Sequence, residues 1–264
     1  MKAIKRITAL ALCALMLLGL LSGCGEKKQG DEKFVLNASV CNVIDSLDPA
    51  MNTDTDADSV FYALYENLMR ESDDGSGEVT LTNGMAKEYA EETNYDGSVT
   101  YRFTLRSTAR WSDGEKVTAD DFVYAWQRLA DPATDSPNHA LMSVVAGYDE
   151  VRESGDVSLL GVKAKGESTF LVTLSRPCAY FITSVCTSPA TAPLRRDLVE
   201  GNASWAATAD IVTNGPYTVG TWVKAAQLQT KRNGEYYESK LGVPDSICFR
   251  FETDSQTNDD QLLA

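Results

Sequence analysis

The chain has 264 residues, 43% hydrophobic and 23% charged, which is enough for one or two domains with a buried core. Its formal charge of −14 opposes contact with phosphate backbones and anionic lipid surfaces, and this excludes nucleic acid from the expected partners. The single histidine, His139, leaves multi-histidine metal sites and most histidine-based catalytic arrangements without the groups they need.

The N-terminus has the pattern of a secretory signal peptide. Basic residues within 2–6 precede an apolar stretch over 7–21, which at about 15 residues is shorter than the roughly 20 that a membrane span needs. The next motif, Leu21-Ser22-Gly23-Cys24, resembles the lipobox of bacterial lipoproteins, in which the cysteine thiol is lipidated. We therefore expect a lipoprotein signal peptide over 1–23, a lipidated Cys24, a polar tether over 24–33 and an extracytoplasmic protein anchored to the bacterial cell membrane. The alternative is an ordinary secretory signal with a chance cysteine.

Four cysteines remain after the lipobox, and their state is open. An exported protein is permitted disulfides, and two bridges among these cysteines would have three possible connectivities. Nothing in their spacing demands a bridge, so free thiols are an equal alternative. There is no CxxC or histidine-containing cluster to indicate zinc. The four are Cys41, Cys178, Cys186 and Cys248.

Short strands separated by irregular loops are predicted along the chain. Alternating apolar residues indicate strands over 34–40 and 100–106, and apolar residues at helical spacing predict a helix over 59–69. Thr118 is a good N-cap with Asp121 three residues later, so a further helix is expected to begin there and to end at Asp131-Pro132.

The second half of the chain continues this pattern. Strands are predicted over 169–174, 218–223 and 227–231, the second of them directly after the turn Asn214-Gly215-Pro216-Tyr217. Trp126 falls on an apolar helix face and is expected in the core, whereas Trp222 fits either a core or a ligand cleft. Since strands and helices do not alternate regularly, the sequence predicts an α+β fold with mixed sheets.

Two chemical motifs are incomplete. Asp54, Asp56 and Asp58 have the spacing of a calcium loop, but Ser59 stands where the turn requires glycine, and Tyr65 stands where the bidentate glutamate belongs. A serine nucleophile would depend on His139, and no G-x-S-x-G motif is present. We therefore expect neither a metal site nor a cofactor, and no catalysis.

A series of motifs runs in order from about residue 34 onward. The series comprises Ser46-Leu47-Asp48-Pro49, Leu64-Tyr65-Glu66-Asn67-Leu68, Met85-Ala86-Lys87-Glu88-Tyr89, residues 101–106, Trp111-Ser112-Asp113-Gly114 with 117–128, Asp131-Pro132, Gly161-Val162-Lys163-Ala164, residues 169–174, and Asn214-Gly215-Pro216-Tyr217 with Trp222. Behind a lipobox, this order resembles the family 5 extracellular solute-binding proteins, the oligopeptide-binding lipoproteins of ABC importers.

The resemblance implies a periplasmic-binding-protein-like fold of type II, in the peptide-binding cluster. The first lobe would combine 34–65 with 188–264, and an inserted domain would occupy 66–187. In the family a second lobe follows the region where this sequence stops. The resemblance therefore implies a truncated chain without the second lobe, which by itself would bind peptides weakly.

The implied function is the capture of oligopeptides for import, by a monomer that delivers them to an ABC permease and its ATPase. Such a site would hold the peptide main chain as an added strand. Where some members have a glutamate that meets the peptide ammonium, this chain has Thr53, so Asp54 or Asp56 would have to substitute. By position, the resemblance assigns peptide contacts to Thr53, Asp54, Thr55, Asn138, His139, Asn214 and Gly215, although a structurally required turn is an equal explanation of the last two.

Two alternatives remain. Within the family, the ligand would be a dipeptide or a nickel or haem complex. From a different class, the chain would be a non-transporting surface lipoprotein used for adhesion or signalling.

Overall fold

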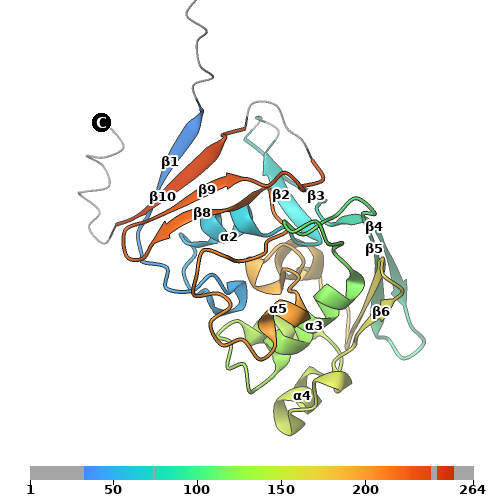
Figure 1. Ribbon diagram of the computed structural model, residues 1–264. Helices are drawn as coiled ribbons and strands as arrows, with labels where there is room; N and C mark the ends of the chain where they lie inside the picture. The colour runs from blue at the N-terminus through green and yellow to red at the C-terminus, as the bar shows by residue number, and fades with distance from the viewer. Residues whose placement is uncertain (1–32, 74, 76, 239–242, 253–264) are drawn as a thin grey trace, which may run out of the picture. The chain divides into compact units, whose positions relative to one another are not determined.

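The computed structural model describes residues 33–73, 75, 77–238 and 243–252. The chain divides into two units, Met1–Phe34 and Val35–Ala264, and the second contains all the strands and helices of the described residues (Figure 1). The expected signal peptide, Cys24 and all but the last residue of the expected tether lie outside the described residues. Within the described part of the chain, no helix has the length and apolar character needed to cross a membrane.

The described strands and helices confirm the α+β class with mixed sheets. The strands are β1 (Val35–Val40), β2 (Met69–Asp73), β3 (Val79–Asn83), β4 (Ala86–Thr93), β5 (Val99–Leu105), β6 (Val162–Lys165), β7 (Thr169–Leu174), β8 (Tyr217–Val223), β9 (Gln227–Arg232) and β10 (Ser246–Phe251). The helices are α2 (Asp58–Leu64), α3 (Ala119–Ala130), α4 (Tyr148–Ser154) and α5 (Arg196–Val199). Short helical turns lie at Pro49–Met51, His139–Val144, Val157–Leu159, Phe181–Val185 and Pro189–Thr191.

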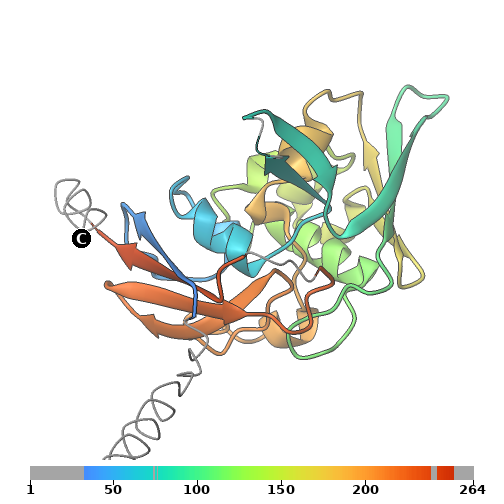
Figure 2. The ribbon, with the colours of Figure 1, turned by 90° about the horizontal axis from the view of Figure 1, so that it is seen from above.

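One four-stranded sheet joins the two ends of the described chain. Its strand order is β1-β10-β9-β8, with β1 parallel to β10 and the other pairs antiparallel. Helix α2 packs against β8. The remaining strands form a two-stranded sheet, β2-β3, and a four-stranded antiparallel sheet, β4-β5-β7-β6. Figure 2 shows the two four-stranded sheets at opposite ends of this unit, with α2 and α3 between them.

The core next to the second four-stranded sheet follows from the apolar alternation in the sequence. Phe103 on β5 and Phe170 on β7 are paired across the sheet and fully buried. From α3, Phe122 and Trp126 place their rings 5.5 and 5.2 Å from the Phe170 ring, Trp126 edge-on. Trp126 is fully buried, so its expected place in the core is confirmed.

Helix α3 begins at the predicted cap. The Asp121 carboxylate accepts hydrogen bonds from the backbone N–H and the hydroxyl of Thr118, at 2.8 and 3.1 Å. It also accepts the indole N–H of Trp111 at 3.2 Å. The capping box therefore fixes the first turn of α3 and ties it to the preceding loop.

The helix predicted over 59–69 is shorter than expected. It ends at Leu64, because Tyr65 is extended, with φ −125° and ψ 143°. The carbonyl of Leu64 accepts a hydrogen bond from the N–H of Gly215 at 2.8 Å. The chain then continues without helical structure to Leu68, and β2 begins at Met69. The prediction of helix over 65–69 was wrong because these apolar residues are buried by contacts distant in sequence, not by continuation of the helix.

Candidate functional site

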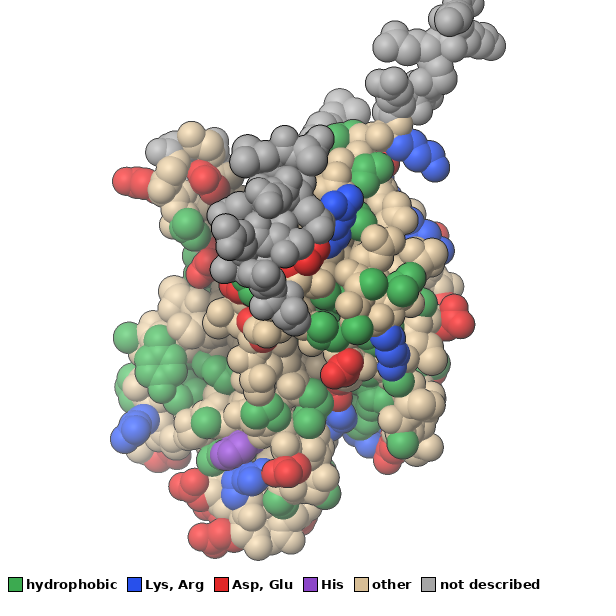
Figure 3. All heavy atoms as spheres, turned by 90° about the vertical axis from the view of Figure 1, so that its left-hand side faces the viewer, with side chains coloured by type: hydrophobic (Ala, Val, Ile, Leu, Met, Phe, Trp, Pro, Cys, Tyr) green, Lys and Arg blue, Asp and Glu red, His purple; other side chains and the backbone are tan. Residues whose placement is uncertain are grey.

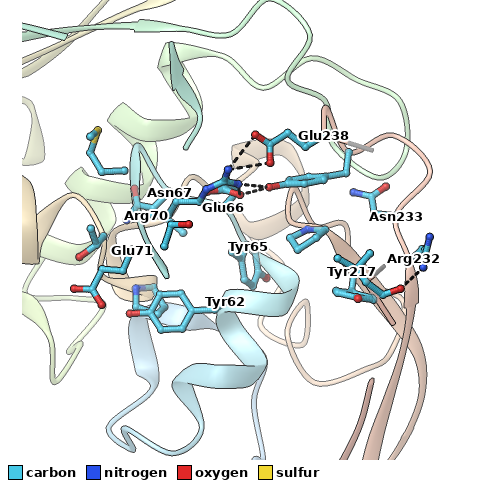
Figure 4. A pocket seen from close by; sticks show the side chains of 18 of the residues that line it. Tyr62, Tyr65, Glu66, Asn67, Arg70, Glu71, Tyr217, Arg232, Asn233 and Glu238 are labelled. Carbon is cyan, nitrogen blue, oxygen red and sulfur yellow. Dashed lines mark hydrogen bonds and ion pairs between the residues drawn. The ribbon is translucent and has the colours of Figure 1, made fainter. Parts of the chain in front are cut away.

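A cavity of about 680 Å³ lies beside α2 and β2, within the range typical of ligand sites (Figure 4). Its wall is built from segments far apart in sequence: α2 and the residues after it, β2, the loop around Pro189, the start of β8 and the loop after β9. We call it the main pocket. Its lining comprises Tyr62, Tyr65, Glu66, Asn67, Met69, Arg70, Glu71, Ser72, Thr187, Pro189, Ala192, Pro216, Tyr217, Arg232, Asn233, Gly234, Tyr236, Glu238 and Val243.

A network of four polar side chains occupies one side of the main pocket. Arg70 donates through Nη2 to both carboxylate oxygens of Glu238, at 3.0 and 2.9 Å. Its Nη1 reaches the Tyr236 hydroxyl at 3.1 Å and Glu66 Oε2 at 3.4 Å, and the Tyr236 hydroxyl donates to the same Glu66 oxygen. Figure 4 shows Arg70, Glu66 and Glu238 converging on one another. These contacts of both terminal nitrogens hold Arg70 in one orientation.

Burial sets the protonation behaviour of this network. Glu66 is only 6% exposed, and its burial raises the pKa of the carboxyl, although the Tyr236 hydroxyl and the Arg70 charge oppose this shift. Burial also raises the pKa of the Tyr236 hydroxyl, with the Glu66 charge acting in the same direction. Tyr236 therefore remains a hydrogen-bond donor at neutral pH.

The raised pKa of Glu66 predicts a pH-dependent stability. Because the pKa of the folded state lies above its ordinary value of 4.5, the folded chain holds this proton more tightly than the unfolded chain does. The free energy of unfolding should therefore fall as the pH rises from about 4.5 through the pKa of the folded state. Glu66→Gln should reduce this slope, as measured by urea unfolding at a series of pH values, while Asp58 and Asp121, whose carboxyl pKa is also raised by burial, keep a part of it. Glu88→Gln, at an exposed position on β4, is the control and should keep the parent slope; equal slopes in the parent and Glu66→Gln would contradict the prediction.

The turn at Asn214 and Gly215 lies next to the main pocket and contacts residues that line it. Asn214 is fully buried; its side-chain oxygen accepts the N–H of Glu66 at 3.2 Å, and its side-chain nitrogen donates to the Glu66 carbonyl at 2.8 Å. Asn233 donates to the carbonyl of Gly215 at 2.9 Å. Asn214 and Gly215 are thus adjacent to pocket-lining residues. Both polar atoms of the Asn214 side chain form hydrogen bonds with the backbone of Glu66.

The loop containing Thr53, Asp54 and Thr55 lines a different hollow, of about 590 Å³, which we call the loop hollow. Asn52 shapes this loop, because its side chain donates to the Asp54 carbonyl at 2.9 Å and accepts the Asp54 N–H at 3.2 Å. Asn138 donates to the Asn52 carbonyl at 2.6 Å. The structure therefore brings Asn138 together with the 53–55 loop, whereas Asn214 and Gly215 do not line the loop hollow.

His139 follows Asn138 but points to another partner. Its Nδ1 lies 2.6 Å from the Tyr148 hydroxyl, and the two rings are stacked. His139 is half-buried and does not line either the main pocket or the loop hollow. The candidate residues therefore fall into two groups, the 53–55 loop with Asn138 and the turn at Asn214 and Gly215. His139 belongs to neither group.

Several residues of the main pocket were missed in the sequence. Glu66 lay within a quoted motif, but Arg70, Tyr236 and Glu238 had no local signal, since they meet across more than 160 positions of the chain. Partners of opposite charge that are distant in sequence, such as Arg70 and Glu238, can be recognised only once the fold brings them together.

The cysteines and the surface complete the description. All four described cysteines are free thiols. The structure therefore shows the free-thiol alternative and no disulfide among these four. Among the described residues, no group of three or more His, Cys, Asp or Glu side chains has the arrangement of a metal site. On the face drawn in Figure 3, acidic and basic side chains are scattered among hydrophobic and polar ones.

Comparison with known proteins identifies relatives over most of the chain. The sequence model of the bacterial extracellular solute-binding proteins, family 5, middle region, matches residues 80–264. The periplasmic oligopeptide-binding protein OppA of Salmonella typhimurium is 35% identical over 210 residues, covering 78% of this chain and 37% of that protein. The dipeptide-binding protein of Lactococcus lactis is 33% identical over 264 residues, covering 97% of this chain and 45% of that protein.

A solved structure agrees with these sequence matches. The Haemophilus influenzae OppA complex with RPPGFSPFR superposes with a TM-score of 0.79 at 30% identity, covering 88% of this chain and 45% of that one. The chain thus spans less than half the length of the proteins it matches. These relatives are solute-binding proteins.

Proposed function

This chain belongs to the family 5 bacterial extracellular solute-binding proteins, and we propose on that basis that it captures oligopeptides for import by an ABC transporter. The observation that carries the proposal is the agreement of the family match with relatives that bind peptides, one of them solved with a peptide bound. The main pocket supports it, because its tyrosines offer aromatic surface beside a few fixed polar groups, as ligand sites commonly do.

A dipeptide receptor is the second candidate. It is favoured by the match to the dipeptide-binding protein of Lactococcus lactis, which extends over 97% of this chain. A pocket of about 680 Å³ is large enough for a dipeptide or a short oligopeptide. Measured affinities for the two kinds of peptide are therefore needed to decide between the two candidate functions.

The wider assignments are also proposals. We place 34–65 and 188–264 in one lobe and 66–187 in an inserted domain; in support, the sheet β1-β10-β9-β8 draws its strands from the first two segments and the other two sheets draw theirs from the third. Peptide contacts at the 53–55 loop, Asn138, His139, Asn214 and Gly215 belong to the same proposal. The site would bind without catalysis.

Delivery of the peptide would require a permease and an ATPase as partners. The protein would act as a monomer outside the cytoplasm, and a lipid on Cys24 would hold it at the membrane. The lipobox-like motif before Cys24 supports the anchor, and mass spectrometry of the mature N-terminus checks it.

A titration followed by amide NMR tests the proposed function. We expect pentaalanine to shift amide signals of residues in the main pocket or around the proposed contacts at the 53–55 loop, Asn138 and His139 at millimolar concentrations, where binding free energies of about −4 kcal/mol are detectable. Dialanine in the same titration distinguishes the two candidates, since a dipeptide receptor should bind it at least as tightly as pentaalanine. Maltose is the non-peptide control and should shift none of these signals. The proposal fails if neither peptide shifts them.

A further inference from the structure

One charged side chain of the main pocket has no partner of opposite charge. Of the two arginines that line the pocket, Arg70 belongs to the network described above, and Arg232 forms an ion pair with Asp245 at 3.3 Å. Glu71 also lines the pocket, and its side chain is exposed. Among the described residues, no hydrogen bond or ion pair engages its carboxylate. The charge that remains available to a ligand at this place is therefore negative.

An aromatic ring and an aliphatic side chain flank this carboxylate. Figure 4 shows Tyr62 of α2 beside Glu71, and Tyr62 is 52% exposed. Burial and the charges of Asp58 and Glu71 raise the pKa of the Tyr62 hydroxyl, so the ring stays neutral. Leu81 on β3 is directly opposite Glu71, so the two side chains share one face of the β2-β3 sheet, and Leu81 is 36% exposed. We call Tyr62, Glu71 and Leu81 the Glu71 corner.

The Glu71 corner has the chemistry that suits a basic side chain. Lysine and arginine carry a cationic head on an aliphatic stem, and the stem packs along apolar surface while the head remains near water. A cationic head pairs with a carboxylate and is attracted to the face of a tyrosine ring. A neutral side chain gains neither of these charge contacts, and an acidic one is repelled. The formal charge of −14 also favours the approach of cationic ligands.

We propose that the Glu71 corner is a subsite for the basic side chain of a bound peptide, in which the Glu71 carboxylate pairs with the cationic head and Tyr62 and Leu81 contact the stem. This inference rests on the proposed function and names a preference of the same pocket, for peptides with lysine or arginine over neutral and acidic ones. The N-terminal ammonium of a peptide carries the same charge without the stem, so the experiment separates these two sources.

Four pentapeptides that differ only at the central residue test the preference on the parent chain. Pentaalanine is compared with peptides that carry lysine, norleucine or glutamate at residue 3, in amide NMR titrations of the full 264-residue chain. The lysine peptide should bind about five-fold more tightly than the norleucine peptide, which has the stem without the charge, and the glutamate peptide should bind most weakly. All four share the N-terminal ammonium, so it cannot cause the difference. Equal binding by the lysine and norleucine peptides overturns the inference.

Substitution of Glu71 locates the preference at the corner. Glu71→Gln keeps the size of the side chain and removes its charge, so the ratio of lysine-peptide to norleucine-peptide affinity should fall from about five to about one. Glu88→Gln removes a carboxylate at an exposed position on β4 and should keep the parent ratio. Each ratio compares two peptides on the same variant, so a loss of affinity common to both cancels.

Two substitutions of Tyr62 test the contribution of the ring. Tyr62→Leu removes the aromatic face and should lower the ratio about two-fold, whereas Tyr62→Phe keeps the face and should leave the ratio unchanged. Equal ratios in these two variants overturn the assignment of the ring to the subsite.

The outcomes separate this inference from the proposed function. A lysine preference that persists in Glu71→Gln places the cation elsewhere, for example beside Asp45 and Asp54 in the loop hollow, and overturns the inference while the proposed function stands. Absence of binding of all four peptides by the parent overturns both.

Discussion

Replacing Arg128 with methionine should lower the free energy of unfolding by about 3–5 kcal/mol, because it leaves a buried carboxylate without its cation. Asp48 is 4% exposed, and Arg128 donates to both of its oxygens, at 3.2 and 2.6 Å. One of these oxygens also accepts the N–H of Ala50 at 3.0 Å and caps the turn Pro49–Met51. The pair thus ties α3 to the loop that leads into residues 53–55.

An exposed ion pair provides the matched control for this variant. Arg196 lies 3.6 Å from Glu200 on the surface, with both side chains more than half exposed, so Arg196→Met should cost less than about 1 kcal/mol. Urea unfolding followed by tryptophan fluorescence measures both variants. If Arg128→Met costs no more than Arg196→Met, the buried pair does not stabilise the fold as expected.

Gly215→Ala should destabilise the chain by about 1–3 kcal/mol, because a Cβ at this position has no space. The added carbon would lie 2.5 Å from the Leu64 carbonyl carbon and 2.7 Å from the Leu64 oxygen and the Tyr65 nitrogen. All three are backbone atoms at the end of α2, which cannot turn aside as a side chain can. The N–H of Gly215 also bonds the Leu64 carbonyl at 2.8 Å, so any shift weakens that contact as well.

Gly234 is the control, since it also lines the main pocket but a Cβ added there would have no neighbouring atom within 4 Å. Gly234→Ala should change the free energy of unfolding by less than about 0.5 kcal/mol. Thermal unfolding of both variants compares them directly. A neutral Gly215→Ala would mean that the close approach of the turn to α2 is not required for the fold.

Local signals in the sequence determined the elements whose stabilising contacts are also local. The cap at Thr118 and the apolar face with Phe122 and Trp126 define α3, because a helix repeats its contacts within a few residues. The alternation in 169–174 corresponds to β7, whose Phe170, Val172 and Leu174 are buried. The motif series likewise identified the family, which the comparisons confirm.

Tertiary structure decided the elements that lack such a pattern. Strand β4, Ala86–Thr93, has one buried residue and lies at the edge of its sheet, so no alternation of apolar residues marked it. The stop of α2 at Leu64 depends on Gly215, about 150 positions away. The pairing of β1 with β10 joins segments separated by most of the chain.

The candidate site divides along the same line. The sequence placed the 53–55 loop and Asn138 among the candidate residues, and the structure joins them through Asn52. The sequence alone could not show that Arg70, Glu66, Tyr236 and Glu238 form one network. The contacts of Arg70 with Tyr236 and Glu238 span 166 and 168 positions of the chain. Repeating contacts along one segment leave a period in the sequence, whereas a single contact between distant segments leaves none, and the main pocket is built almost entirely from contacts of the second kind.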